Sequence, residues 1–421
     1  MTRTQAALLS ILFIGFLAAP TAQALVTTDV LPAGVRAGAF VWGASKTVTS
    51  SFGPNGQVNS LVSPLNLSLS LEDLGEFEGQ AKDLAAVLNG LSPDQLGAKL
   101  LLTDLYSEVA VAEQRSVFGF LWGINAKWSV GVIAPIVHRR ARFSFKAEVI
   151  DNSKAYANLI GAVPKLQEGL QQLKESSLGT DTFANAIFAD NGYNLPTEQN
   201  FYSFGDLEFE SRFHYLSFKR SDFTLRTNLK LPTATHDSDM KNLLDRPVGD
   251  ETYSLKVGSV QSYKLVPGRL TVSAALFGTL FAPMTKRMGV PKSSTQALPD
   301  LTDPYQITDV TKLRSPQFNS DVSLMLDFWK GAMSFSVSHI FLKKGRDSYS
   351  GSKDLYYKYY ENDTEGYEQG IEISGEVSTI PLYLDNIFPA PGKLTVSWYQ
   401  PFDGKNQVIA PYGRVDFVML F

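Results

Sequence analysis

The chain has 421 residues, a formal net charge of −4, 44% hydrophobic and 19% charged residues, and no cysteine. The negative balance excludes a nucleic-acid binder that depends on basicity, and the lack of cysteine excludes disulfides, thiol catalysis and thiolate metal sites. The length allows two or three soluble domains or one mid-sized membrane barrel. The ordinary hydrophobic content fits both, because half of each barrel strand faces a wet lumen.

The chain begins with a targeting segment. Arg3 supplies a positive charge, residues 6–19 an apolar stretch, and Ala22-Gln23-Ala24 a cleavage pattern of small residues. We therefore predict a signal peptide over 1–24 and a mature chain over 25–421. The apolar stretch is short for a spanning helix, and no later window offers about 18 uninterrupted apolar residues. An exported chain of this kind is integral to a membrane only as a closed β-barrel, which pairs every backbone group internally.

Two long insertions carry helical patterns. In the first, 51–103, apolar residues recur at helical spacing on both sides of the cap-and-turn signal Ser92-Pro93-Asp94. In the second, 141–202, apolar residues from Tyr156 to Leu173 line one face of a helix. Insertions of this length are usually functional or disordered. The second helix is expected either to pack on its own loop or to cover the pore as a lid or plug.

Period-2 alternation predicts about 12 strands, and it is clearest from Gly205 onward, where Leu207, Phe209 and Phe213 alternate with charged residues. Residues 57–71 leave a count of 14 open. Short turns alternate with long connections, which is typical of outer-membrane barrels, and an even count puts both termini in the periplasm. The predicted strand ranges are 34–46, 105–118, 125–137, 205–218, 223–232, 253–266, 270–281, 318–329, 333–342, 367–380, 393–402 and 408–421.

The last ten residues define the closing strand. One face of this strand is apolar or small, with Val415, Phe417 and Met419, and the other face carries Arg414 and Asp416. A chain that ends on a bare aromatic residue, here Phe421, resembles bacterial outer-membrane β-barrels, whose assembly machinery reads a terminal phenylalanine. The resemblance implies that Phe421 is an assembly signal. It also implies the outer membrane as location, with its lipid, its lipopolysaccharide and the barrel-assembly machinery as partners.

Charged residues on the inward phase of the strands are expected to line the lumen. They either form a polar ladder that pairs across strands, since unpaired charges there are costly, or they set a constriction that selects what passes, as rings of charge do in pores. The two roles are compatible. The predicted lumen-lining residues are Glu208, Glu210, Arg212, His214, Arg226, Lys230, Asp321, Asp327, Glu368, Glu372, Arg414 and Asp416.

The sequence offers no catalytic or metal-binding set, and no cofactor is expected. The four histidines have no metal-like spacing. Outer-membrane phospholipases carry an outward Ser-His pair, but Phe341 stands where the serine would follow His339, which is expected at the membrane interface. His236 with Asp237 only weakly resembles the Asp and His pairs of omptin-like proteases.

Two groups at strand ends have two interpretations each. The run His138-Arg139-Arg140 with Arg142 is a solvated strand end or a contact for lipopolysaccharide phosphates. The tyrosines near residues 356–367 form either an aromatic girdle at the membrane interface or an apolar loop surface.

A family resemblance covers about 80 residues. The strand start Gly205-Asp206-Leu207, the strand end Leu231-Pro232-Thr233 and the loop pair Gly249-Asp250 resemble the outer-membrane family named for the meta-pathway of phenol degradation. Those barrels are similar to channels for fatty acids and aromatic hydrocarbons. The chain departs from the pattern at Ala234, where the family often has glycine, and it lacks the N-terminal plug segment of the fatty-acid channels.

We therefore predict an all-β transmembrane antiparallel barrel with two helical insertions. The preferred function is passive uptake of small hydrophobic or aromatic compounds as substrates, through a narrow charged lumen. The runner-up is a structural or surface-interaction barrel with a blocked lumen, and a barrel hydrolase comes third.

Overall fold

The computed structural model describes residues 29–61, 67–74, 79–91, 96–149, 160, 163–176, 189, 191–194, 198–242, 245, 247–294, 296 and 299–421. The predicted signal peptide, 1–24, lies outside the described residues. Within these ranges, none of the helices has the length and apolar character needed to cross a membrane.

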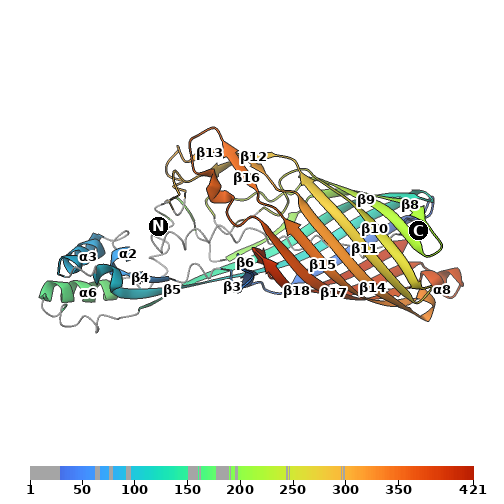
Figure 1. The fold of residues 1–421 in the computed structure, drawn as a ribbon, viewed down its shortest axis with the longest axis horizontal. Helices are drawn as coiled ribbons and strands as arrows, with labels where there is room; N and C mark the ends of the chain where they lie inside the picture. The colour runs from blue at the N-terminus through green and yellow to red at the C-terminus, as the bar shows by residue number, and fades with distance from the viewer. Residues whose placement is uncertain are drawn as a thin grey trace.

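Twelve antiparallel strands close into a barrel, which confirms the predicted all-β class with helical insertions. The ring is closed by pairing between β5 and β6, and Figure 1 shows the strands wrapped around one axis. In ring order the strands are β5 (Leu101–Asn125), β1 (Arg36–Ser45), β20 (Tyr412–Leu420), β18 (Gly392–Lys405), β17 (Gly366–Ser378), β15 (Met333–Lys344), β14 (Gln317–Phe328), β11 (Leu270–Phe281), β10 (Ser254–Val266), β9 (Ser221–Leu231), β8 (Leu207–Ser217) and β6 (Trp128–Val149).

The outer face of the barrel is apolar. Along β15, Phe335 and Val337 are exposed while the alternating Ser336 and Ser338 are buried. The same alternation runs around the ring, so that the wall presents a continuous belt of apolar side chains. A belt of this extent suits acyl chains and not water. Large exposed members of the belt include Phe40, Trp42, Phe118, Phe120, Phe209, Phe213, Leu276, Leu324, Ile373, Trp398 and Phe417.

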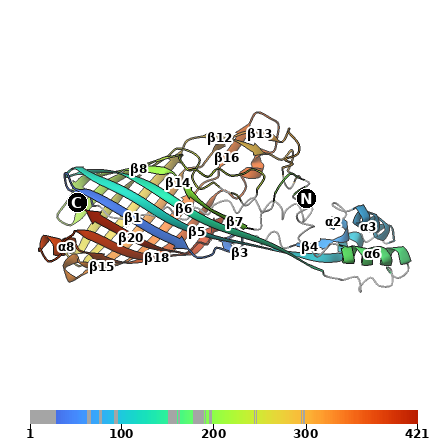
Figure 2. The same ribbon diagram turned by 180° about the vertical axis from the view of Figure 1, so that it is seen from behind.

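The two ends of the barrel differ. At one end, the N–H of Phe421 donates to the carbonyl of Arg36, and the N–H of Arg36 donates to the carbonyl of Phe421, both at 2.9 Å. The start of β1, the C-terminus and the short helix α8 (Ile380–Leu384) therefore lie together, at what we call the turn end (Figure 2). The opposite end carries the long connections, and we call it the arm end.

The arm is the extension of β5 and β6 beyond the barrel wall. The wall strand β1 pairs with β5 only between Gln114 and Trp122, yet β5 and β6 stay paired as far as Thr103 and Val149. The arm projects far beyond the other strands (Figure 1). The short strand β7 (Glu198–Phe204) pairs with its base on β6.

The prediction for this hairpin was wrong in two respects: the strands are longer than the predicted ranges 105–118 and 125–137, and the turn lies at residues 126–127 and not between these ranges, at 119–124. Gly123 is a strand residue, and it is glycine because a Cβ there would collide with the carbonyl of Pro32. Lys127, which shares the inward phase in the sequence, lies exposed in the turn.

Helices from both predicted insertions meet at the tip of the arm. They are α2 (Leu71–Leu74), α3 (Gly79–Leu91), α4 (Leu96–Lys99) and α6 (Pro164–Ser176), beside the short strand β4 (Leu67–Ser70). Leu88 of α3 and Leu166 of α6 are 1% exposed in a shared core. Gly169 permits the close approach of the two helices, because a Cβ there would press on Leu84. Helix α6 of the second insertion thus packs on the first insertion, away from the barrel, whereas Tyr193 of the same insertion lines the cavity at the arm end.

Two small sheets sit at the arm end. One contains β12 (Met284–Gly289), β13 (Ile307–Leu313) and β16 (Ser348–Gly351), next to the 3-10 helix η4 (Tyr357–Tyr360), and we call it the outer sheet. The other contains β2 (Ser50–Phe52), β3 (Val58–Ser60) and β19 (Gln407–Val408). Residues 57–71 contribute β3 and β4, and neither belongs to the ring, so the alternative count of 14 spanning strands is not found.

Candidate functional site

A cavity of about 780 Å³ lies inside the barrel near the arm end. It is lined by inward side chains of β5, β6, β8–β11, β14, β15 and β17 and by residues of the outer sheet, which closes over it. The lining mixes aromatic rings with charges, among them Phe277, Phe281, Lys256, Lys312 and Glu208. The volume is in the range that accommodates small organic ligands.

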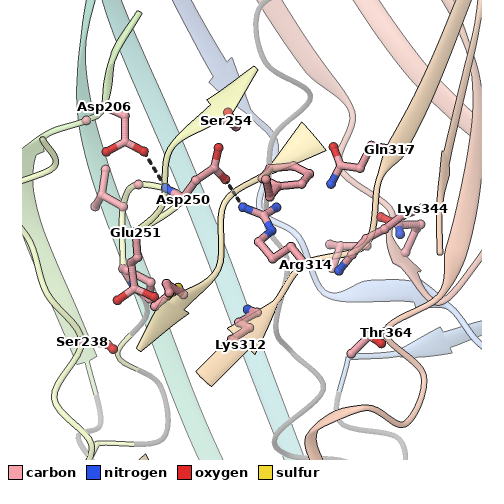
Figure 3. Close-up of a pocket in the computed structure, with 18 of the residues that line it drawn as sticks. Asp206, Ser238, Asp250, Glu251, Ser254, Lys312, Arg314, Gln317, Lys344 and Thr364 are labelled. Carbon is pink, nitrogen blue, oxygen red and sulfur yellow. Dashed lines mark hydrogen bonds and ion pairs between the residues drawn. The ribbon is translucent and has the colours of Figure 1, made fainter. Parts of the chain in front are cut away.

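Asp250 is the hub of the cavity wall. Its Oδ2 accepts a hydrogen bond from Lys230 Nζ at 2.9 Å, and its Oδ1 accepts one from Arg314 Nη1 at 2.5 Å. The guanidinium of Arg314 lies over the ring of Phe281, 4.1 Å from its centroid. Figure 3 shows Asp206 and Arg314 on either side of Asp250. This network joins β9, the loop before β10 and the segment after β13.

Asp206 holds the loop that carries Asp250. Its carboxylate accepts from the backbone N–H groups of Thr233 and Ala234, each at 3.1 Å, and of Asp250 at 2.6 Å. Gly249 is glycine because a Cβ there would collide with this carboxylate. The Gly-Asp, Leu-Pro-Thr and Gly-Asp segments singled out in the sequence therefore meet in space at one carboxylate.

The pKa values of groups outside the spanning strands follow from burial and charge. Burial raises the pKa of Asp206 above its usual range, although its backbone donors oppose the effect. Burial acts the same way on Asp250, but Lys230 and Arg314 outweigh it and hold the Asp250 pKa below its usual range. Burial, followed by repulsion from Arg314, lowers the pKa of Lys312 to about 8. At pH 7 Asp250 is therefore ionised and Lys312 is mostly protonated.

Replacing Asp206 with alanine should loosen the β9–β10 loop. Three backbone donors lose a buried acceptor, which costs about 1–3 kcal/mol of local stability. We expect trypsin to cut the folded protein faster at Lys241 in this loop, as followed by mass spectrometry. The control is Asp309→Ala, on the exposed side of β13. Equal cleavage rates in the two variants would contradict the assigned role.

Inside the barrel, from the cavity toward the turn end, a layer of charged and aromatic side chains points into the interior. We call this layer the constriction, and we define it by inward residues on β8–β10, β14, β17, β18 and β20. A 12-strand barrel is wider than one filled by its own side chains and narrower than a wide porin, so the side chains decide whether it is open. The constriction residues are Glu210, Arg212, Arg226, Lys256, Asp321, Glu372, Tyr399, Tyr412, Arg414 and Asp416.

One side of the constriction holds a buried carboxylate between two arginines. Glu210 is 6% exposed. Its Oε1 accepts from Arg212 Nε at 2.9 Å and from Arg226 Nη2 at 2.5 Å, and its Oε2 accepts from Arg212 Nη2 at 3.2 Å. Lys256 is next to this group, with its Nζ 4.5 Å from the centroid of Phe277. These contacts fix the cations against the wall.

The opposite side combines tyrosines with carboxylates. Tyr399 is 1% exposed, and its hydroxyl donates to Glu368 Oε1 at 2.6 Å. Its ring lies 5.2 Å from the ring of Tyr412. Arg414, 2% exposed, forms ion pairs with Glu372 at 3.5 Å and Asp416 at 3.0 Å. Buried aromatic and ionic groups thus fill this half of the interior.

The structure distributes the predicted lumen residues over three levels. At the turn end, His214 contacts the Leu216 carbonyl, and Asp327 precedes the β14–β15 turn. Those that line the cavity are Glu208, Glu210, Arg226, Lys230 and Glu368, of which Glu210 and Arg226 also belong to the constriction. The other predicted residues of the constriction are Arg212, Asp321, Glu372, Arg414 and Asp416.

Sequence reasoning missed four residues of the site. Tyr399 and Tyr412 were overlooked, although each alternates with an outward neighbour on its strand, as Tyr399 does with Trp398, and this alternation is the signal that points to them. Asp250 and Arg314 lie just outside regular strands, where alternation gives no direction. Only the loop motif Gly249-Asp250 drew attention to that region.

The histidines do not form a catalytic arrangement. His339 is exposed on the apolar face, 6.0 Å from the ring of Phe402. His236 contacts Asp245 Oδ1 at 2.6 Å and stacks on Phe201, whereas Asp237 pairs with Lys286. Among the described residues, no group of three or more His, Asp or Glu side chains is arranged to hold a metal ion.

No family model matches the sequence. No curated protein matches it either. Among solved structures, the chain is similar to an outer-membrane channel from Pseudomonas putida F1, with a TM-score of 0.52 and 10% identity over 94% of this chain and 98% of that one. This similarity shows a shared barrel fold.

Two further structures align at lower scores. The toluene transporter TodX of Pseudomonas putida gives a TM-score of 0.28 and 9% identity over 93% of this chain and 90% of that one. A Pseudomonas aeruginosa FadL homologue gives 0.30 and 7% over 92% and 89%. These scores add no argument about the chain.

Proposed function

We propose that this chain is an outer-membrane channel for passive uptake of small hydrophobic or aromatic compounds. The observation that carries the proposal is the cavity inside a closed, lipid-compatible barrel, with Phe277, Phe281 and Tyr349 in its lining. Aromatic rings give apolar solutes a surface to pack on, and the surrounding charges keep the space hydrated. The shared fold with an outer-membrane channel is consistent with this function.

The proposal includes an orientation. The turn end, with the start of β1 and Phe421, faces the periplasm, and the arm end faces outward. Phe421 then lies where the barrel-assembly machinery reads it. Arg140 and Arg142, which are exposed at the base of the arm and share Glu198, are the proposed contacts for lipopolysaccharide phosphates.

A second candidate function is a barrel blocked by its own side chains, which displays the helices of the arm to a partner. The observation that favours it is the burial of Tyr399 and Arg414 in the constriction. A hydrolase receives no comparable support, because the described histidines contact no nucleophile.

Conductance in a planar lipid bilayer separates the two candidates. Purified protein is expected to give steady, small ionic currents, because charged groups line a water-accessible path. Protein denatured before insertion serves as the control. Persistent silence of folded, inserted protein would reject the channel and support the blocked barrel.

Uptake is then measured with vesicles that enclose a fluorescent reporter of an aromatic solute. A faster signal in vesicles with the channel than in protein-free vesicles is expected. Equal rates would remove aromatic compounds from the proposed substrates.

A further inference from the structure

The constriction carries opposite charges on opposite walls. On β8–β10 lie the cations Arg212, Arg226 and Lys256 with a single carboxylate, Glu210. On the other wall, β14, β17 and β20 contribute three carboxylates with the single cation Arg414. One wall therefore has a surplus of positive charge, and the other has a surplus of negative charge.

The ring order places most of these groups across the lumen from each other, and Asp321 beside the basic wall. In a ring of twelve, strands six places apart are opposite, so that β8 faces β17 and β10 faces β20, whereas β14, at the edge of the acidic wall, lies two places from β10 with β11 between them. The two charged groups also lie at one level, because Asp321 is within electrostatic reach of Lys256 on one side and of Glu372 on the other. Opposed surpluses at one level produce an electric field directed across the pore.

The acidic wall offers polar atoms that nothing in the described structure satisfies. Asp321 is 5% exposed, yet its Oδ1 has no hydrogen-bond partner among the described residues, and the same holds for Asn319 Oδ1 and Ser397 Oγ. Buried acceptors normally have a donor, and leaving them without one is costly. Two of these atoms are acceptors that suit the N–H groups of an ammonium ion.

The basic wall offers the complementary group. Lys256 is half-buried beside the Phe277 ring and has no ion pair with any described residue. The arginines of this wall are already engaged by Glu210. The carboxylate of a solute would therefore bind to Lys256.

We propose that the constriction binds small zwitterions, molecules that carry an ammonium and a carboxylate on one frame, with the ammonium toward Asp321 and the carboxylate toward Lys256. This proposal deepens the proposed function by naming a substrate class, and it rests on that function for transport. A zwitterion satisfies both walls at once. A solute with one charge satisfies one wall and leaves the other unpaired.

The test compares three solutes of similar shape by calorimetric titration of the purified protein in detergent at pH 7. They are L-phenylalanine, 3-phenylpropionate, which lacks the ammonium, and phenethylammonium, which lacks the carboxylate. L-phenylalanine is expected to bind roughly tenfold more tightly than either, because each lost charge-assisted hydrogen bond costs about that factor. Equal affinities, or tighter binding of a singly charged solute, would overturn the proposal.

Two variants locate the effect. K256M and D321N should each abolish the preference for L-phenylalanine, while K264M on the same strand β10 and D309N on the outer sheet should preserve it. Reversal potentials in a KCl gradient give a second readout: K256M should shift selectivity toward cations and D321N toward anions. Loss of the preference in the control variants as well would place the site elsewhere. A barrel that binds the zwitterion but passes no current would refute the channel and leave the binding site standing.

Discussion

Replacing Glu210 with glutamine is expected to lower the free energy of unfolding by about 3–5 kcal/mol, because it leaves two buried guanidinium groups without their counter-charge. Arg212 and Arg226 are 16% and 14% exposed, and both depend on this one carboxylate. Their mutual repulsion, now screened by Glu210, would add to the loss. Urea unfolding of the protein in detergent or lipid, followed by tryptophan fluorescence, measures the change.

The matched control is Glu198→Gln, which removes the carboxylate from an exposed pair of arginines, Arg140 and Arg142. Exposed ion pairs contribute little to stability, so this variant should unfold at nearly the same urea concentration as the parent. If the two variants lost equal stability, the burial of the Glu210 network would not explain its contribution. A double change of Arg212 and Glu210 to neutral residues should recover part of the loss, since it leaves one arginine unpaired in place of two.

Replacing Tyr399 with alanine is expected to raise single-channel conductance several-fold. The ring is among the largest fully buried side chains of the described residues, and it fills the constriction beside Tyr412. Conductance depends on the narrowest point of a pore, and an alanine leaves that point open to water and ions. The expected cost is about 3–5 kcal/mol of stability, as for other buried aromatic deletions, so the heat-shifted gel mobility of the folded barrel must be checked first.

Two variants on the same strand serve as controls. Tyr399→Phe keeps the ring and removes only the hydrogen bond to Glu368, so its conductance should stay near that of the parent. Trp398→Ala removes a ring of comparable size from the outer face and should leave the current unchanged. A folded Tyr399→Ala barrel that stayed silent would place the obstruction at another level.

Period-2 alternation was sufficient to predict the barrel. On β15 Phe335 and Val337 face outward while Ser336 and Ser338 face inward, and on β17 Ile371 and Ile373 face outward while Glu372 and Ser374 face inward. That contrast exists because one face meets hydrocarbon and the other meets water. The same physics placed Glu210, Glu372 and Arg414 inside the barrel from the sequence alone.

The arm was not predicted because its strands extend beyond the lipid-facing wall of the barrel. Beyond Gln114 on β5 and His138 on β6 the chain no longer separates lipid from lumen, so the alternation that identifies a spanning strand fades. The pairing of helices from two insertions also depends on contacts between segments far apart in the chain, such as Leu84 with Gly169, which local patterns do not encode. Local spacing predicts the helices, but the packing of one insertion's helix on the other is known only from the fold.

The sequence was enough to predict which strand residues face the interior of the site, but not which of them contact one another. Sequence phase indicates that Lys230 and Glu208 face inward, whereas their link to Asp250 and Arg314 depends on how two irregular segments cross the barrel mouth. Asp206 illustrates the difference. The motif around it was visible, but its role as acceptor for three N–H groups follows only from the fold.

The length of the arm determines how far its helices lie from the membrane. A strand of 25 residues measures roughly 80 Å at the usual rise, whereas about ten residues cross the hydrocarbon. Between Tyr106 and Ala110, β5 is paired only with β6 within the described chain, and a two-stranded ribbon twists more strongly than a wide sheet. The helices at the tip of the arm therefore lie well beyond the hydrocarbon region, so that a partner bound to them would sit apart from the barrel mouth.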